Sequence, residues 1–120
     1  MTESIKLKKM RTSELTDAAL DWAVAKCEGM PRLNERVTPE GVHWAGHFFQ
    51  PSKHWSKGGP IIEREKIQVN PSISSDTWGA ASPSKDQCVW VWAETPLIAA
   101  MRCYVASRLG EEVEVPEELA

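Results

Sequence analysis

Residues 55–64 combine an aromatic ring, adjacent glycines and basic groups in one short stretch. Trp55-Ser56-Lys57 precede Gly58-Gly59-Pro60, and Arg64 follows. Adjacent glycines let backbone N–H groups approach an anion closely, basic side chains hold phosphates, and a Trp ring offers a surface for base stacking. The stretch therefore indicates a site for a small anionic, nucleotide-like ligand. The alternative is a tight turn that joins an aromatic cluster to a strand.

Arg102 lies among Ala100, Met101 and Cys103 on a helix that should be mostly buried. A buried guanidinium needs a partner, so Arg102 is either an anchor for a carboxylate or phosphate ligand or a structural arginine. A structural Arg102 would pair with Glu or Asp, or extend to the surface. The predicted ligand-binding residues are Trp55, Ser56, Lys57, Gly58, Gly59, Arg64, Trp78 and Arg102.

The six tryptophans fall into three groups. Trp22 recurs at helical spacing with apolar neighbours, which predicts a core position. Trp90 and Trp92 are two residues apart in a β-type run, so they share one face of a strand, which is either core or an aromatic platform. Trp44, Trp55 and Trp78 are predicted in loops, where aromatic side chains often serve recognition.

Catalytic and metal-binding patterns are weak in this sequence. Two histidines, His43 and His47, are spaced as in a metal site on a helix, in the run H-W-A-G-H. Gly41 and Gly46 disfavour a helix there. Phosphate-binding loops, dinucleotide fingerprints and nucleophile elbows are missing. Glu63 and Glu65 alternate with basic residues, which is typical of a solvated charge run. We therefore expect no enzyme activity, no metal and no cofactor.

Composition limits the class of protein. The chain has 120 residues, 42% of them hydrophobic and 26% charged, which favours a single domain over residues 1–120. A net charge of −3 makes nucleic-acid binding unexpected. There is no apolar run long enough to span a bilayer and no secretory signal, so we expect no membrane partner. Three cysteines, Cys27, Cys88 and Cys103, are expected as reduced thiols, with Cys103 a small core residue.

Periodicity predicts two main helices, at about 13–27 and 96–109. Thr12 or Ser13 can cap the first, and Thr95 with Pro96 opens the second. Short β-type runs lie between them, with a turn at Gly58-Gly59-Pro60 ahead of Ile61-Ile62. The expected fold class is α+β, with a small antiparallel β-sheet packed against the two helices and with aromatic-rich loops.

Three segments are expected to lie outside this core. Residues 1–11 carry four basic groups and are predicted to form a flexible basic arm. Residues 70–87 are rich in Ser, Pro and Gly, which is typical of a mobile loop. Residues 111–120 form an acidic tail with five glutamates and one short exposed strand.

Three blocks of the sequence together resemble a known family. They are Thr12–Ala25, with its T-S-E-L-T start; Trp55–Glu65, with W-S-K-G-G-P-I-I-E-R-E; and Thr95–Ser107, which leads into Gly110 and Pro116. In this order they are similar to the NinX-like family of small proteins from lambdoid and related tailed phages and prophages. The resemblance implies a phage accessory protein that works in the cytoplasm of the infected bacterial host.

Accessory phage proteins of this size often counter host defences, and this step is made by analogy. The first hypothesis is a protein that binds and sequesters a nucleotide-like signalling molecule without turning it over. We expect a homo-oligomer, because small pockets are often completed at subunit interfaces. The alternative is an inhibitor or adaptor that binds a host defence protein through exposed loop tryptophans.

Overall fold

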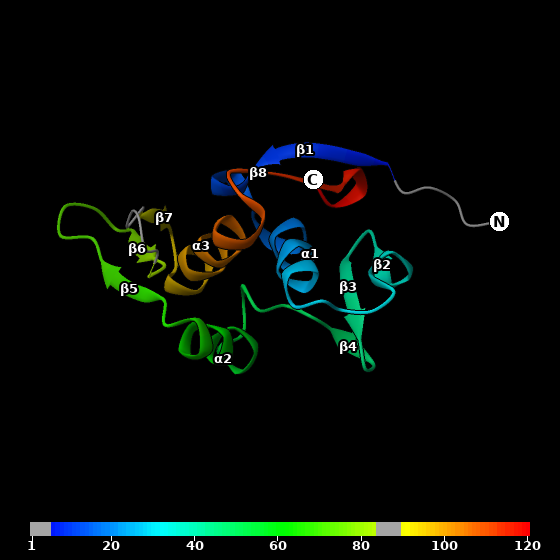
Figure 1. The fold of residues 1–120 in the computed structure, drawn as a ribbon, viewed down its shortest axis with the longest axis horizontal. Coiled ribbons are helices and arrows are strands. Elements are labelled where there is room, and N and C mark those ends of the chain that lie inside the picture. Colours follow the sequence, from blue (N-terminus) through cyan, green and yellow to red (C-terminus); the bar gives the residue numbers. More distant parts are fainter. Residues whose placement is uncertain (1–5, 84–89) are drawn as a thin grey trace.

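The computed structural model describes residues 6–83 and 90–120 (Figure 1). Its three helices are α1 (Asp17–Cys27), α2 (Trp55–Glu65) and α3 (Pro96–Leu109). The strands are β1 (Leu7–Arg11), β2 (Val37–Thr38), β3 (Gly41–Trp44), β4 (His47–Phe48), β5 (Gln68–Pro71), β6 (Trp78–Ala81), β7 (Val91–Ala93) and β8 (Glu112–Pro116). Single 3₁₀ turns span Thr12–Glu14, Leu33–Arg36 and Glu117–Leu119. The α+β class is confirmed.

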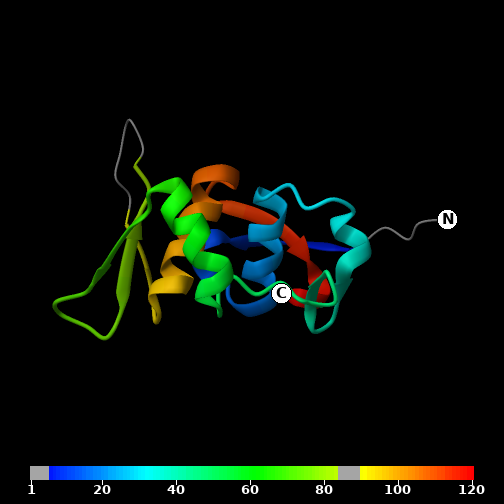
Figure 2. The same ribbon diagram turned by 90° about the horizontal axis from the view of Figure 1, so that it is seen from below.

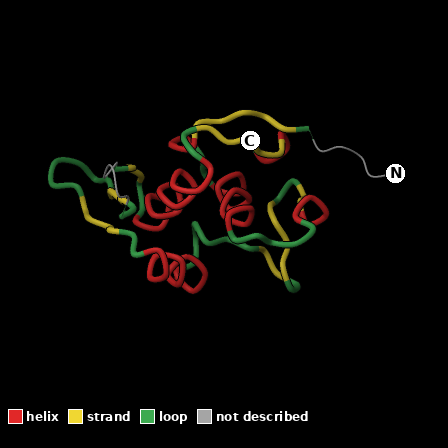
Figure 3. Tube along the Cα trace, viewed as in Figure 1, coloured by secondary structure: helices red, strands yellow, loops and turns green. Residues whose placement is uncertain are grey.

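The strands form three small antiparallel sheets in place of the single sheet that was expected. Their strand orders are β1-β8, β2-β3-β4 and β5-β6-β7. Each sheet packs against a helix: the β1-β8 and β2-β3-β4 sheets contact α1, and the β5-β6-β7 sheet contacts α3 (Figure 3). The β5-β6-β7 sheet lies at one end of the molecule, with α2 and α3 on one side of it (Figure 2).

Helix α3 is the centre of the core, as its nearly all-apolar sequence predicts. Thr95 Oγ1 accepts a hydrogen bond from the Ile98 N–H at 3.1 Å, and Pro96 occupies the first turn. Met101 and Tyr104 are almost fully buried. The helix packs against α1, α2 and strands of two sheets, so it fixes where those elements meet.

Helix α1 begins at Asp17, four residues later than the predicted start at Ser13. The reason is the hydroxyl of Thr12, which donates to the Gly110 carbonyl at 2.6 Å and does not cap α1. Leu15 is then extended and fully buried. A contact distant in sequence therefore outweighs the local capping signal.

Residues 55–65 were expected to form a turn followed by a strand, and this prediction is wrong. They form α2, which has Gly58 and Gly59 inside it. A Cβ atom on Gly58 would lie 2.5 Å from Leu97 Cδ2 and 2.6 Å from the Pro51 carbonyl oxygen. Gly58 therefore allows α2 to pack closely against α3, and this contact offsets the low helix propensity of glycine.

The predicted flexible arm and exposed acidic tail each contain a paired strand, β1 and β8. Strand β1 pairs with β8 along its whole length, from Leu7 opposite Pro116 to Arg11 opposite Glu112. Val113 and Val115 of β8 are buried. Basic and acidic residues thus face each other across the ladder, where opposite charges stabilise a sheet.

The loop predicted at 70–87 is wrong at residues 70–71 and 78–81, which are strands, while residues 72–77 and 82–83 are loop and residues 84–87 lie outside the described residues. Strands β5 and β6 form a hairpin whose turn is ordered by hydrogen bonds. The Ser72 N–H donates to the Thr77 carbonyl at 2.9 Å, and the hydroxyls of Ser75 and Thr77 lie 2.7 Å apart. Cys88, which was predicted as a reduced thiol in the strand run, is also outside the described residues.

Candidate functional site

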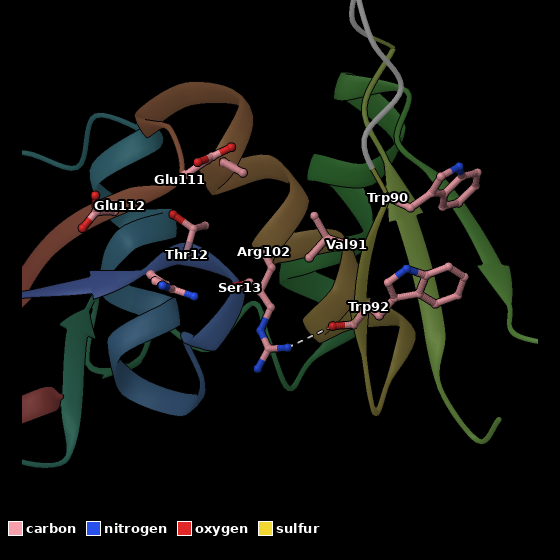
Figure 4. A pocket seen from close by; sticks show the side chains of 10 residues that line it. Thr12, Ser13, Trp90, Val91, Trp92, Arg102, Glu111 and Glu112 are labelled. Carbon is pink, nitrogen blue, oxygen red and sulfur yellow. Dashed lines mark hydrogen bonds between the residues drawn. The ribbon is translucent and has the colours of Figure 1, made fainter.

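A cavity of about 690 Å³ lies between the β1-β8 sheet and strand β7, beside α3 (Figure 4). Its size is that of pockets that hold small molecules. It brings together residues from both ends of the sequence. The lining residues are Arg11, Thr12, Ser13, Trp90, Val91, Trp92, Arg102, Ala106, Glu111 and Glu112.

Arg102 reaches from α3 across this cavity. Its Nε donates to the Leu15 carbonyl at 2.8 Å, and one terminal nitrogen donates to the Trp92 carbonyl at 3.0 Å. These bonds connect α3 to the segment before α1 and to β7. A guanidinium carries five N–H donors, so Arg102 keeps donors for a further acceptor.

Within residues 6–83 and 90–120, Arg102 forms no ion pair with a carboxylate. Burial lowers the pKa of its guanidinium, and the negative charge of Glu94 partly offsets that effect. The charge of Arg102 is therefore incompletely compensated by the described protein. An anion that entered the cavity would supply the missing counter-charge.

Charge is distributed unevenly in the cavity. Figure 4 shows the guanidinium of Arg102 near β7, while Glu111 and Glu112 lie toward the opposite side, beyond Thr12. An anion therefore finds its most favourable position close to Arg102 and away from the two carboxylates.

The rings of Trp90 and Trp92 extend to the far side of β7 from Arg102 (Figure 4). Their centroids are 6.2 Å apart and their planes are inclined by 29°, so the two rings stack. Trp92 is 51% exposed. The shared face that was predicted for this pair is therefore an exposed aromatic platform, and the core alternative is wrong.

Of the predicted ligand-binding residues, Arg102 alone lines this cavity. Trp55, Ser56 and Lys57 are exposed on the first turn of α2. The N–H of Gly58 donates to the His54 carbonyl at 3.0 Å inside the helix. Gly59 lies under the Trp55 ring, which would be 3.8 Å from a Cβ placed there. The expected concavity of glycine N–H groups is therefore not formed.

Arg64 is fully engaged in an ionic cluster, where it was expected to hold a phosphate. It donates to both carboxylate oxygens of Glu28, at 3.1 and 2.6 Å, and to Glu65 at 2.8 Å. Tyr104 donates to Glu28 at 2.6 Å, and Arg108 donates to Glu65 at 2.8 Å. We call these five residues the ionic cluster; it joins α1, α2 and α3.

The other loop tryptophans are not loop residues. Trp78 lies on β6 and packs partly buried against the core. Trp44 lies on β3 under the guanidinium of Arg36, 4.4 Å from the ring centroid. Trp55 is exposed, as predicted, but on a helix.

The histidine motif forms a hairpin. Ala45 and Gly46 have φ angles of 52° and 85°, as in a two-residue turn, and they join β3 to β4. Within the described part of the chain, His, Cys, Asp and Glu side chains form no group of three that could hold a metal ion. None of the described helices has both the length and the apolar character that crossing a membrane requires.

Arg11, Glu111 and Glu112 were missed as cavity residues, because they belonged to segments that were expected to be solvated, and Ser13 was considered only as a cap of the first helix. The signal that could have found them is the opposite charge of 1–11 and 111–120, which the β1-β8 ladder explains.

Comparison with known proteins agrees with the resemblance in the sequence. No curated protein matches the chain. The model of the family described as bacteriophage P22 NinX matches residues 11–108, a range that includes all three helices and seven of the eight strands in whole or in part. The chain therefore belongs to the NinX family of bacteriophage proteins.

Proposed function

We propose that this phage protein binds and sequesters a small anionic, nucleotide-like molecule in the Arg102 cavity without turning it over. The observation that carries the proposal is Arg102 itself, which is partly buried, donates to two backbone carbonyl groups, and lies in a cavity of about 690 Å³. A ligand phosphate would accept the remaining N–H donors of this guanidinium.

This site replaces the one that was expected on residues 55–64. Arg11 supplies a second cation at the cavity wall, and Ser13 supplies a hydroxyl. In the infected cell, such a protein would lower the free concentration of a defence signal by binding it. A homo-oligomer that completes the cavity is part of the proposal.

The test is calorimetric titration of the protein with a panel of mono-, di- and cyclic nucleotides. We expect binding to at least one of them, and Arg102→Met should weaken it by tenfold or more, because a charge-assisted contact is lost. Arg32→Met is the matched control, since Arg32 is exposed and pairs with Glu35 on the surface. The proposal would be contradicted if both variants weakened nucleotide binding equally, or if the wild type bound none of the nucleotides.

A second candidate is an inhibitor or adaptor that binds a host defence protein. The observation that favours it is the exposure of Trp55, Trp90 and Trp92 on the surface. Tryptophan is enriched among residues that dominate protein–protein affinity. This candidate would be supported if a host protein copurified with the wild type but not with Trp92→Ala, and if the protein bound no nucleotide.

A further inference from the structure

The outer face of the β5-β6-β7 sheet carries two tryptophans, and none of the described strand residues on this face is charged. The strand register places Asn70, Gly79 and Trp92 side by side on this face, with Gln68 and Ala81 one pair further along. Trp90 is two residues before Trp92 and lies on the same side of the strand (Figure 4). Trp78, Val91 and Ala93 face the opposite way, toward the core.

Gly79 is what allows this face to be flat. A Cβ atom on Gly79 would lie 2.8 Å from Cζ3 and 3.0 Å from Cη2 of the Trp92 ring. The indole therefore rests directly on the glycine of the neighbouring strand, and Trp90 stacks beside it. Close packing beneath the ring fixes its orientation, so little side-chain freedom is lost when a partner binds.

The amides of Gln68 and Asn70 are exposed next to the rings. Neither amide hydrogen-bonds to another side chain in the described part of the protein. The face therefore offers flat aromatic surface, N–H donors from two indoles and two amides, and no ionic group.

These properties select one class of partner. A polyproline II segment has no internal hydrogen bonds, so its carbonyls are free to accept, and its rings pack on aromatic side chains. Single-stranded nucleic acid would need cations on this face, where the described strand residues supply none, and the chain has a net charge of −3. Addition of a partner's β-strand to β7 is hindered, because the Trp92 carbonyl already accepts a hydrogen bond from Arg102.

We propose that the Trp90–Trp92 face docks an uncharged, extended, proline-rich segment of a partner protein. The proposal rests on the second candidate function, for which it names the surface and the chemistry of the partner. It does not require a ligand in the Arg102 cavity.

The test is fluorescence anisotropy of a labelled polyproline peptide with the whole protein. We expect saturable binding, which Trp92→Ala weakens at least tenfold and Trp92→Phe weakens less, because an aromatic ring remains. Trp55→Ala is the matched control, since Trp55 is exposed to a similar degree, 54% against 51%, on a different element. Circular dichroism checks that each variant is folded.

A second variant keeps both tryptophans. Gly79→Ala displaces the Trp92 ring from the sheet and should weaken peptide binding while Trp92 is still present. Equal affinities for the wild type, Trp92→Ala and Gly79→Ala would overturn the proposal. Binding of an uncharged oligosaccharide or of oligothymidine in place of the peptide, or a self-association that Trp92→Ala abolishes, would also overturn it. The peptide assay contains no nucleotide, so its result is separate from the calorimetric one.

Discussion

Arg64 on α2 and Arg102 on α3 each connect their helix to other elements, but through very different partners. Arg64 donates to two carboxylates, and the charges of the ionic cluster balance within the fold. Arg102 donates to two backbone carbonyls and has no carboxylate within ion-pairing distance among the described residues; only the longer-range charge of Glu94 acts on it. The first arginine is therefore fully used by the structure, and the second keeps capacity for a ligand.

The pKa values of the surrounding groups follow this difference. Burial acts to raise the pKa of Glu28, but hydrogen bonds from Arg64 and Tyr104 outweigh it and lower the value. Hydrogen bonds from Arg108 and Arg64 lower the pKa of Glu65. For Arg102 the main effect is burial, which lowers the pKa of the cation. The ionic cluster thus stabilises its charges, whereas the cavity leaves one charge poorly solvated.

The largest effect on stability should come from separating α2, which carries Arg64, from α3. Gly58→Ala places a methyl group 2.6 Å from the Pro51 carbonyl oxygen, and this backbone atom cannot move independently. We expect a loss of about 3 kcal/mol in the free energy of unfolding, typical of severe overpacking. Urea denaturation measures it.

Gly59→Ala is the control for this prediction. Its new Cβ would meet only Trp55 Cε3, at an ordinary distance of 3.8 Å. Since alanine favours helix over glycine, this variant should be stabilised by about 0.5–1 kcal/mol. Similar losses for the two variants would show that the close contact at Gly58 does not matter.

Asp21 shows what a buried charge without a contacting cation does to stability. It is 2% exposed and accepts the Ser52 N–H at 2.9 Å, and burial raises its pKa from 3.8 to about 6. A raised folded-state pKa favours the protonated form, so its stabilisation is present below pH 3.8 and is lost as the pH rises through about 6. Asp21→Asn should remove this decline, a difference of about 3 kcal/mol, in denaturation curves measured across that window.

The direct comparison is between Arg64→Met and Arg102→Met. Half of the Arg64 side chain is exposed, so solvent screens its ion pairs, and we expect a loss of about 1–2 kcal/mol in unfolding free energy. Arg102→Met removes two hydrogen bonds to carbonyls and should cost about 1 kcal/mol. Thermal denaturation in parallel measures both; a larger loss for Arg102→Met would mean that Arg102 is mainly structural.

Acid should separate the two arginines further. The lowered pKa values of Glu28 and Glu65 mean that their stabilisation is present above pH 4.5, their ordinary value, and is lost as the pH falls through the lower folded-state values. The cost of Arg64→Met should therefore shrink in acid. The cost of Arg102→Met should change much less, because its acceptors are backbone carbonyls, which do not titrate, and the charge of Glu94 has a smaller effect on Arg102 than burial has. Measuring each variant against the wild type at the same pH cancels the contribution of Asp21.

Local sequence signals were sufficient for some parts of the fold. The apolar run of 96–109 with Thr95 and Pro96 predicted α3, and the alternation of Trp90 and Trp92 predicted a shared face. The family was also identified from the sequence, and the α+β class was correct.

The errors come from contacts between residues distant in sequence. Gly58 and Gly59 have the propensity of a turn, and the close approach of Leu97 and Pro51 to Gly58 cannot be seen in the local sequence. The charges of β1 and β8 suggest solvated ends until each strand is seen beside the other. The candidate cavity could not be predicted from the sequence for the same reason, because its wall joins Thr12 to residues near Gly110. Arg102 was identified because a cation among the apolar residues in the middle of a helix is visible in the local sequence.

The pairing of β1 with β8 also has a mechanical consequence. Leu7 is opposite Pro116, so the outer ends of the two strands lie at the same end of the ladder. A force applied between these residues would load the hydrogen bonds one after another, as in a zipper, and would not shear them all together. The pair would therefore open at low force, which gives a protein-unfolding machine an easy starting point at this sheet. The ladder can close only after α3 and β8 have been synthesised, so β1 has no strand partner during most of translation.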